Sequence, residues 1–196
     1  VDDVLAAVAR LAGGEPLQYV LGIACFYGRD FKVNPSVLIP RPETEILCRS
    51  AVDMLSGSCE SLYHDRISQG SPAGRRLRML DLCTGSGCIA LSVLAHRPDL
   101  TAVAVDVSEK ALAIAKKNAD ALGLSSRVRF FLCDVLRDEL PFPLPDDILS
   151  NPPYIRTDVI PTLEKEVRFE PSLALDGGED GLLFYKTMLE RFSPHR

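Results

Sequence analysis

The stretch Arg78-Met-Leu-Asp-Leu-Cys-Thr-Gly-Ser-Gly87 decides the fold of this chain. Its first part, Arg78–Cys83, is a short apolar run that predicts a buried strand, and Thr84–Gly87 then predicts a tight turn. The apolar segment Cys88–His96 that follows predicts a helix. A buried strand that passes through a glycine turn into a helix is typical of a parallel α/β sheet.

The same alternation of strand and helix continues toward the C-terminus. The expected elements are a strand over Thr101–Val105 that ends on Asp106, a helix over Glu109–Leu122 between Ser108 and Gly123, and strands over Arg127–Leu132 and Asp147–Ser150. Strands that alternate with helices predict βαβ units with right-handed crossovers. The predicted fold class is therefore α/β, with an open, parallel, Rossmann-like sheet.

The flanking segments are expected to add smaller elements. These are a helix over Val1–Ala12, a hairpin within Pro16–Val37 whose second strand covers Asp30–Val33, a helix over Ile46–Leu55 opened by Thr44-Glu45, a flexible insert over Ser56–Arg76, a partly helical segment over Arg156–Arg168 and a helix from Leu182 to about Phe192. An open sheet normally continues beyond a fourth strand, because an unpaired hydrophobic edge promotes aggregation. We therefore expect this chain to be part of a longer protein.

The composition is that of an ordinary globular protein. The chain has 196 residues, of which 46% are hydrophobic and 25% charged, so one domain can bury a sizeable core. It contains no run approaching the ~20 apolar residues of a membrane span and no signal peptide. The net charge of −5 provides no general attraction to phosphate backbones, so a nucleic-acid partner would need a local basic patch.

The cysteines argue against a metal site and against disulfides. The chain has six cysteines: Cys25, Cys48, Cys59, Cys83, Cys88 and Cys133. They form no CxxC pair, and their spacing relative to the three histidines is not that of metal ligands. Cys83 and Cys133 stand at predicted strand ends, where a cysteine usually packs as a small buried hydrophobic residue. We therefore expect a reducing, cytoplasmic compartment and no metal.

The tetrapeptide Asn151-Pro-Pro-Tyr154 ends the last predicted strand. Proline donates no ladder hydrogen bond and favours an extended conformation in the residue before it, so Asn151 is expected at the strand's mouth. Its amide and the two proline-fixed carbonyls form an array of acceptors for an NH2 group, and Tyr154 offers an aromatic face beside them. An ordinary strand-ending Asn-Pro turn is the alternative interpretation.

Functional-looking features fall on four successive strand ends: the Gly85/Gly87 turn, Asp106, Asp134 and Asn151. Ligands of open parallel sheets bind outside the carboxyl ends of the strands. Asp106 stands about 20 residues past the turn, where a carboxylate accepts hydrogen bonds from ribose hydroxyls. Asp134 suits an exocyclic adenine amine. Taken singly, each is equally compatible with a loop aspartate or a packing glycine.

The glycine turn is not a dinucleotide fingerprint. The pattern Asp81-x-Cys83-x-Gly85-x-Gly87 lacks the G-x-G-x-x-G spacing, and it lacks the lysine of a P-loop. A nucleotide-sugar or NAD-binding domain is therefore disfavoured. A nucleoside with an amino-acid tail fits better, since Asp81 could pair with its ammonium and the turn amides with its carboxylate.

Together these motifs resemble class I S-adenosylmethionine-dependent methyltransferases. The resemblance rests on Asp81–Ala90, the Asp106 strand end and Asn151-Pro-Pro-Tyr154. The segments Pro40-Arg-Pro-Glu-Thr-Glu45, Glu15–Gly22 and Leu175-Asp-Gly-Gly-Glu-Asp-Gly-Leu182 narrow it to the PrmC/HemK family. That family methylates the glutamine amide in the Gly-Gly-Gln motif of peptide chain release factors.

The resemblance implies a cofactor, a protein partner and a set of site residues. It implies S-adenosylmethionine as cofactor, a peptide chain release factor as partner, and no metal, direct nucleic-acid or membrane contact. The implied site residues are Asn151, Pro152, Pro153 and Tyr154 for catalysis and substrate binding, Arg41 and Glu43 for substrate contact, and Asp81, Cys83, Thr84, Gly85, Ser86, Gly87, Asp106, Asp134, Val135 and Asn151 for the cofactor.

The chain departs from the family pattern in three places. Cys83 replaces the first glycine of the loop, residues 1–37 correspond to a remnant of the N-terminal helical domain with a hairpin, and the catalytic domain, 38–196, lacks the last three strands. Two other interpretations of the function therefore stay open. One is a nucleic-acid exocyclic-amine methyltransferase that uses the same acceptor array on a flipped base. The other is a truncated, non-catalytic module that only binds the cofactor.

Overall fold

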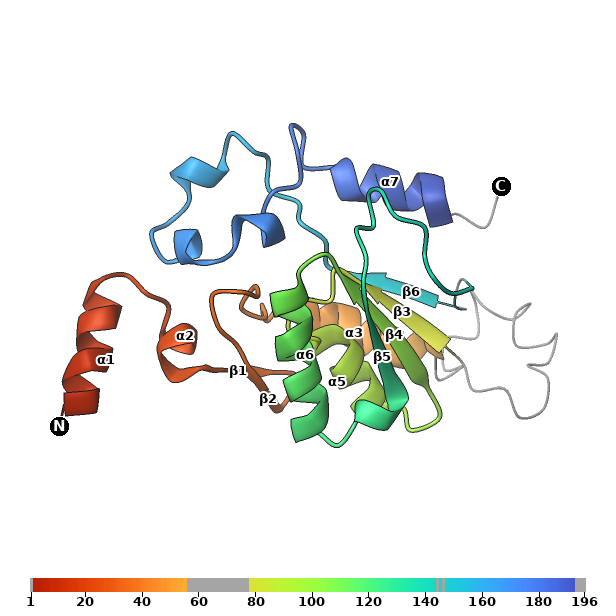
Figure 1. Cartoon of the computed structure of the whole chain (residues 1–196), viewed down its shortest axis with the longest axis horizontal. Helices are drawn as coiled ribbons and strands as arrows, with labels where there is room; N and C mark the ends of the chain where they lie inside the picture. Colours follow the sequence, from red (N-terminus) through yellow and green to blue (C-terminus); the bar gives the residue numbers. More distant parts are fainter. Residues whose placement is uncertain (1, 56–77, 144, 146, 193–196) are drawn as a thin grey trace.

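The computed structural model describes residues 2–55, 78–143, 145 and 147–192, and its centre is a four-stranded parallel sheet (Figure 1). The strands are β3 (Arg78–Leu82), β4 (Thr101–Asp106), β5 (Val128–Leu132) and β6 (Asp147–Ser150), in the spatial order β5-β4-β3-β6. The predicted α/β class with an open parallel sheet is confirmed.

The strand order places a switch point beside β3. From β3 the chain moves outward to β4 and β5, and then returns to the opposite side of β3 as β6. In register, Leu82 pairs with Val105 of β4 and with Ser150 of β6. The carboxyl ends of three strands therefore lie level with one another, and ligands of open α/β sheets bind at such an edge.

Helices cover both faces of the sheet (Figure 1). On one face lie α3 (Thr44–Leu55), α5 (Cys88–His96) and α6 (Glu109–Ala121), in one cluster with Met79 and Ala102. On the other face α7 (Leu183–Phe192) packs against Leu80 and Leu82. Neighbouring strand residues point to opposite faces, so an apolar run such as β3 requires cover on both sides.

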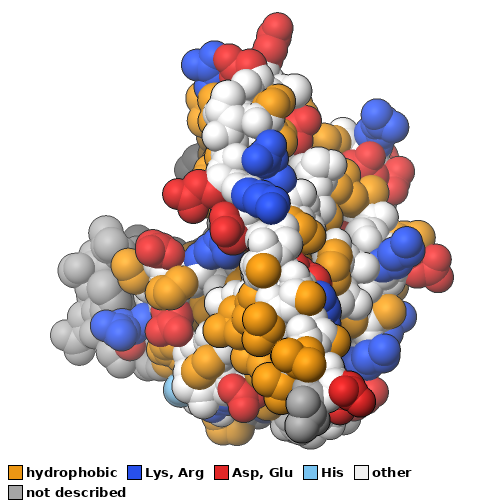
Figure 2. All heavy atoms as spheres, turned by 90° about the vertical axis from the view of Figure 1, so that its left-hand side faces the viewer, with side chains coloured by type: hydrophobic (Ala, Val, Ile, Leu, Met, Phe, Trp, Pro, Cys, Tyr) orange, Lys and Arg blue, Asp and Glu red, His pale blue; other side chains and the backbone are white. Residues whose placement is uncertain are grey.

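The N-terminal helix extends away from the sheet, whereas the hairpin that follows it lies beside α6 (Figure 1). The N-terminal elements are α1 (Asp2–Ala12), α2 (Leu17–Leu21) and the antiparallel hairpin β1 (Ile23–Phe26) and β2 (Arg29–Lys32). The hairpin belongs to the core, because Phe26 and Phe31 are fully buried. No residue of α1 is buried, and Figure 2 shows hydrophobic side chains gathered over it.

Most expected elements agree with the structure, and the differences are local. The short helix α2 was not predicted, since five residues are too few to show a helical period. The segment Arg156–Arg168 forms 3₁₀ turns at Ile160–Thr162 and, at its end, Val167–Phe169, and a third turn follows at Ser172–Ala174. The predicted flexible insert over Ser56–Arg76 lies outside the described residues. No helix in the described ranges is long and apolar enough to cross a membrane.

Candidate active site

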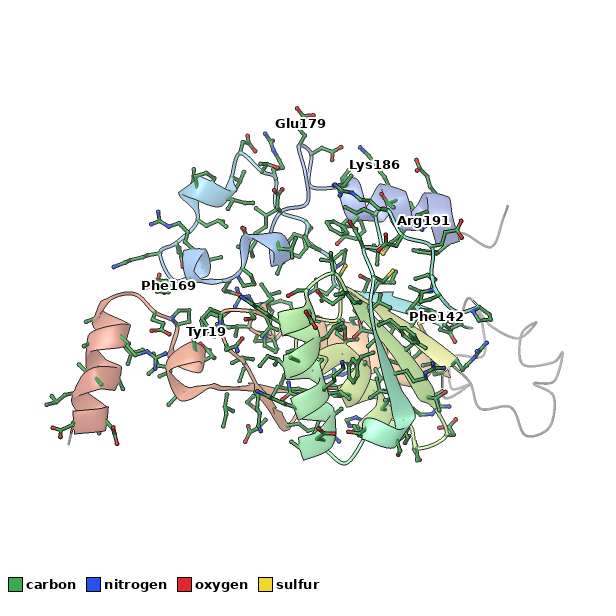
Figure 3. All side chains as sticks on the ribbon, in the orientation of Figure 1. Tyr19, Phe142, Phe169, Glu179, Lys186 and Arg191 are labelled. Atoms are coloured by element: carbon green, nitrogen blue, oxygen red, sulfur yellow. The ribbon has the colours of Figure 1, made fainter. Side chains whose placement is uncertain are left out.

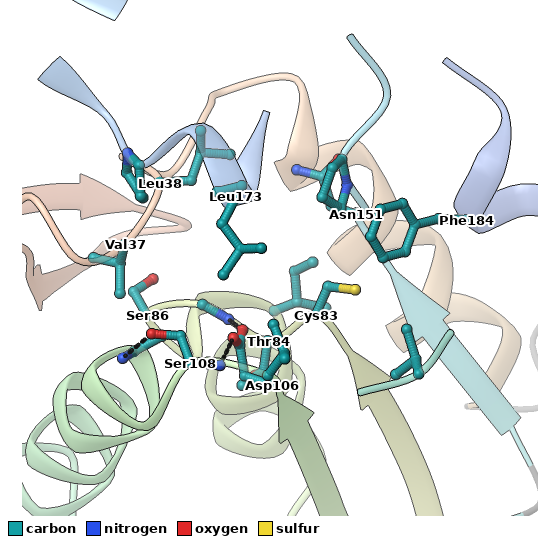
Figure 4. A pocket seen from close by; sticks show the side chains of 18 of the residues that line it. Val37, Leu38, Cys83, Thr84, Ser86, Asp106, Ser108, Asn151, Leu173 and Phe184 are labelled. Atoms are coloured by element: carbon teal, nitrogen blue, oxygen red, sulfur yellow. Dashed lines mark hydrogen bonds between the residues drawn. The ribbon is translucent and has the colours of Figure 1, made fainter. Parts of the chain in front are cut away.

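A cavity of about 400 Å³ opens at the carboxyl ends of the strands (Figure 4). All four strands contribute to its floor, through Cys83 after β3, Asp106 at the end of β4, Cys133 after β5 and Asn151 after β6. Of the predicted site residues, those that line it are Arg41, Cys83, Thr84, Gly85, Ser86, Asp106, Asp134, Val135, Asn151 and Pro153. The structure therefore brings together the four strand ends that the sequence predicts to converge.

The turn after β3 is held in a conformation that depends on glycine at two positions. Gly85 has φ +56°, and Gly87 has φ +81° with an added Cβ only 3.2 Å from Cβ of Ala115 on α6. Gly85 therefore supplies the backbone angle, and Gly87 in addition lets α5 and α6 approach. Cys83 also adopts a positive φ, +58°, which is uncommon for a residue with a side chain.

Asp106 anchors this turn as well as facing the cavity. Its Oδ2 accepts a hydrogen bond from the Gly85 N–H at 2.8 Å, and its Oδ1 accepts one from the Ser108 N–H at 2.9 Å (Figure 4). Burial raises the pKa of Asp106, and the backbone hydrogen bonds oppose that rise. Each carboxylate oxygen has more than one acceptor site, so both can also accept a ligand hydroxyl.

Asp81 lies behind the turn and not on the cavity surface. It is fully buried, and its Oδ2 accepts hydrogen bonds from the Thr84 hydroxyl at 2.6 Å and the Ala90 N–H at 3.2 Å. Among the described residues, its Oδ1 has no hydrogen-bond partner. Burial raises its pKa to about 7, and the charge of Asp106 adds to the rise. The geometry makes Asp81 a brace between turn and helix, one layer below any ligand.

Asp134 and Val135 form the wall beyond β5. The Asp134 Oδ1 accepts a hydrogen bond from the Leu136 N–H at 3.0 Å, and its Oδ2 lies 3.6 Å from Nε of Arg137. Val135 is buried and belongs to the same apolar cluster as Leu82. An aspartate beside a valine presents one polar and one apolar surface to the cavity.

Asn151 stands at the mouth of β6, and its amide is held by a neighbour. Its Nδ2 donates a hydrogen bond to Oγ1 of Thr44, the first residue of α3, at 3.3 Å. Within the described ranges no hydrogen bond involves its Oδ1 or the carbonyl oxygens of Pro152 and Pro153. Those acceptors therefore remain available to a ligand.

Four predicted site residues other than Asp81 lie outside the cavity lining. Gly87 acts in the packing described above, Pro152 is buried, and Glu43 is exposed on the loop before α3. Tyr154 is 54% exposed, beyond the rim. The pKa of Tyr185 on α7 is raised by burial first and then by the charge of Tyr154.

Comparison with known proteins agrees with this geometry. The family model described as methyltransferase small domain matches residues 67–165, which is half of the chain. The chain belongs to the methyltransferase small domain family. The cavity at the strand ends is therefore the candidate active site of this methyltransferase domain.

Curated relatives confirm the resemblance suggested by the motifs. Proteins named release factor glutamine methyltransferase are 42% identical in Moorella thermoacetica, over 93% of this chain and 59% of the relative, and 44% identical in Nitratidesulfovibrio vulgaris, over 89% and 54%. The one from Bacillus subtilis is 40% identical, over 90% and 57%. The chain thus spans little more than half the length of these relatives.

A solved structure supports the fold alone. The catalytic domain of hMettl16, in complex with a hairpin of the MAT2A 3′UTR, superposes with a TM-score of 0.58 at 16% identity, over 93% of this chain and 72% of that one. At that identity, the agreement extends to the arrangement of strands and helices and no further.

Sequence reasoning predicted the upper wall of the cavity only in part, through the segment around Arg41 and Glu43. This wall consists of Ser36–Thr44 on one side and Pro171–Ala174 on the other, and Leu173 points into the cavity in Figure 4. An ion pair between Arg41 and the buried Glu170 joins the two segments. The prolines around Arg41 were a signal for this segment, whereas a single glutamate 129 residues away gave none.

Phe184 of α7 also lines the cavity without having been predicted. It lies beside Asn151 in Figure 4. No sequence signal distinguishes it from the other apolar residues of the helix. Among the residues that the structure describes, no group of three or more His, Cys, Asp or Glu side chains is placed to hold a metal ion.

Proposed function

We propose that this domain transfers a methyl group from S-adenosylmethionine to the side-chain amide nitrogen of the glutamine in the Gly-Gly-Gln motif of peptide chain release factors. The observation that carries the proposal is the Asn151 amide, which stands with a free acceptor at the wall of a cavity of about 400 Å³. The names of the relatives supply the substrate class.

The residues of the cavity fit the cofactor. Its volume of about 400 Å³ is within the range of small-molecule sites. Asp106 offers carboxylate oxygens to ribose hydroxyls, and Asp134 beside Val135 offers an acceptor and an apolar surface to an adenine ring. The turn Cys83–Ser86 exposes backbone near a helix start, where a carboxylate binds favourably. When bound, the sulfonium supplies an electrophilic methyl group.

The acceptor array addresses the main obstacle of the reaction. An amide nitrogen is a poor nucleophile, because its lone pair is delocalised into the carbonyl. Oδ1 of Asn151 and the Pro152 carbonyl would each accept a hydrogen bond from one N–H of the substrate amide. These two hydrogen bonds would orient the amide nitrogen toward the methyl group. Complete alignment of two reactants can lower a barrier by as much as about 7–11 kcal/mol, and a misplacement of about 1 Å can cost about 10²-fold in rate. No strong base is required, since the proton can leave once the nitrogen is alkylated.

Thr44 determines which way the Asn151 amide faces. As long as Nδ2 donates to the Thr44 hydroxyl, Oδ1 is directed away from α3 and is left for the substrate. The segment containing Pro40-Arg-Pro-Glu-Thr44 thus contributes to the site through Arg41 and Thr44, while Glu43 stays exposed for contact with the protein substrate.

Tyr154 is proposed to stack on the amide plane of the substrate glutamine. In the structure its side chain is exposed and does not line the cavity, so stacking requires the side chain to turn toward it. Rotation of an exposed side chain about χ1 is fast and inexpensive. We further propose residues 38–196 as the catalytic domain and residues 1–37 as the remnant of an N-terminal helical domain with a hairpin, which packs on the catalytic core. We also propose a cytoplasmic location alongside the translation machinery.

The test measures transfer of labelled methyl from S-adenosylmethionine to a peptide chain release factor. Wild-type protein should label it, and a release factor whose motif glutamine is changed to alanine should stay unlabelled. Asn151→Ala should reduce kcat by about 10²-fold, as expected for lost alignment. Thr44→Val should lower kcat, whereas Thr44→Ser, which keeps the hydroxyl, should stay close to wild type.

The labelling assay, together with a binding measurement, distinguishes the two alternative functions. Labelling of DNA or RNA in place of the release factor would identify an exocyclic-amine methyltransferase. Calorimetric binding of S-adenosylmethionine with no labelling of any acceptor would identify a binding module. Equal labelling by wild type and Asn151→Ala would refute the acceptor array.

A further inference from the structure

The segment Leu175-Asp-Gly-Gly-Glu-Asp-Gly-Leu182 has no role in the site described so far. It leaves the upper wall of the cavity, forms a loop and enters α7. At the tip of this loop Glu179 points away from the molecule (Figure 3). Leu175, Gly177 and Gly181 are buried, so the base of the loop lies within the structure.

The base of the loop pairs with the backbone that follows Tyr154. The Ile155 N–H donates to the Leu175 carbonyl at 2.9 Å, and the Gly177 N–H donates to the Ile155 carbonyl at 2.7 Å, which makes a parallel bridge. The Thr157 N–H adds a bond to the Gly178 carbonyl at 3.0 Å. The chain after Asn151-Pro-Pro-Tyr154 is therefore tied to a second strand-like segment.

Two glycines of the loop lie directly against Tyr154. A Cβ added to Gly177 would stand 2.7 Å from Cα and 2.8 Å from the carbonyl carbon of Tyr154, and one added to Gly181 would stand 2.5 Å from the Tyr154 carbonyl oxygen. These are backbone atoms, which cannot rotate away. Gly177 does not have a positive φ, so only this close approach requires glycine there.

We propose that Gly177 and Gly181, which we call the glycine clamp, are positioning residues for the acceptor array. This inference rests on the proposed function. The array is anchored on one side by β6, which pairs with β3, and on the other side by the clamp. Between the two anchors the prolines fix φ, so the Pro152 carbonyl and the root of the Tyr154 side chain are held in place.

The first test observes Tyr154 without relying on activity. The chain has no tryptophan, so Tyr154→Trp creates a single fluorescent reporter at this position. In that background Gly177→Ala should shift the emission maximum and increase iodide quenching at least twofold. Gly178→Ala is the matched control, because its Cβ meets only Leu183, at 3.1 Å, although its φ of +86° adds backbone strain.

The second test measures kinetics with Tyr154 restored. Gly177→Ala should lower kcat by about 10²-fold, the loss expected from displacement by about 1 Å. The Kd for S-adenosylmethionine should stay within twofold of wild type, because the clamp does not line the cofactor cavity. Gly178→Ala should keep kcat within about threefold. A purely structural role would instead reduce cofactor binding and kcat together.

A third variant covers the case in which Gly177→Ala does not fold. The Asp176 Oδ1 accepts hydrogen bonds from the Thr157 hydroxyl at 2.7 Å and the Gly178 N–H at 2.9 Å, so Asp176→Ala loosens the loop without adding a collision. It should change the quenching in the same direction. Unchanged quenching in the folded variants overturns the inference, as does unchanged kcat in an active protein. If the wild type transfers no methyl group but Gly177→Ala still shifts the emission maximum of the reporter, only the proposed function is overturned.

Discussion

At the scale of single residues, the two aspartates of the site have different environments. Asp106 reaches the cavity and accepts two backbone hydrogen bonds, one on each oxygen. Asp81 is fully buried and leaves one oxygen without a partner. Removal of an ionised carboxylate from water is costly, so the buried residue favours its neutral form. The stability of the domain therefore depends on pH through Asp81.

The first prediction concerns Asp81→Asn. The folded pKa of Asp81 is raised from 3.8 to about 7, so between these values the folded state binds more protons than the unfolded state. Wild-type stability should therefore fall as pH rises from about 4 to about 7, by at most about 1.4 kcal/mol per unit from this group. Asp81→Asn should remove that slope. Urea denaturation at several pH values checks this, and equal slopes in both proteins contradict it.

At the scale of elements, α6 connects the hairpin to the glycine turn. Its buried Asn118 accepts a hydrogen bond from the Lys32 N–H at 2.7 Å, and its Nδ2 donates to the carbonyls of Lys32 at 3.1 Å and Ser86 at 2.8 Å. One side chain thus provides hydrogen-bond partners for backbone groups at the edge of β2 and in the turn that lines the cavity. Buried polar groups of this kind require partners.

The second prediction concerns Asn118→Leu. The substitution keeps a similar volume but leaves the Lys32 N–H and two carbonyls without partners. The free energy of unfolding should fall by about 1–3 kcal/mol for the unsatisfied groups. Lys117→Leu, on the exposed side of the same helix, is the control and should change stability by about 0.5 kcal/mol at most. Chemical denaturation measures both. A similar loss in the two variants would show that Asn118 has no special role.

At the scale of the whole molecule, two segments far apart in sequence close over the cavity. Glu170, whose side chain is 2% exposed, pairs with Arg41 and accepts a hydrogen bond from the Ile39 N–H at 3.0 Å. Arg41 itself is 34% exposed and lines the cavity. The ion pair therefore joins the segment before α3 to the segment after Phe169.

The third prediction concerns Arg41→Met. The variant leaves Glu170 buried without its cation, and such a loss costs about 3–5 kcal/mol when both partners are buried. Since Arg41 is a third exposed, we expect the lower end of that range. Glu170→Gln combined with Arg41→Met should lose less than the sum of the single losses. A double-mutant cycle measures this coupling, and strict additivity would contradict it.

The sequence alone determined the strands and helices of the central sheet and the residues at their ends. The apolar runs, the glycines of the turn, the Ser108 cap and the prolines after Asn151 act within a few residues, and each appears in the structure where its local signal placed it. The convergence of the four strand ends also followed from sequence, because parallel strands end at one edge.

Only the tertiary structure decided which side chains meet. It placed Asp81 behind the turn, paired Arg41 with Glu170, and brought Thr44 to Asn151 across 107 residues of chain. It also seated the glycine clamp on Tyr154. Contacts of this kind depend on how whole elements pack, and the residues involved have no pattern that links them along the chain. Local physics therefore made the parts of the site predictable, while packing determined their partners.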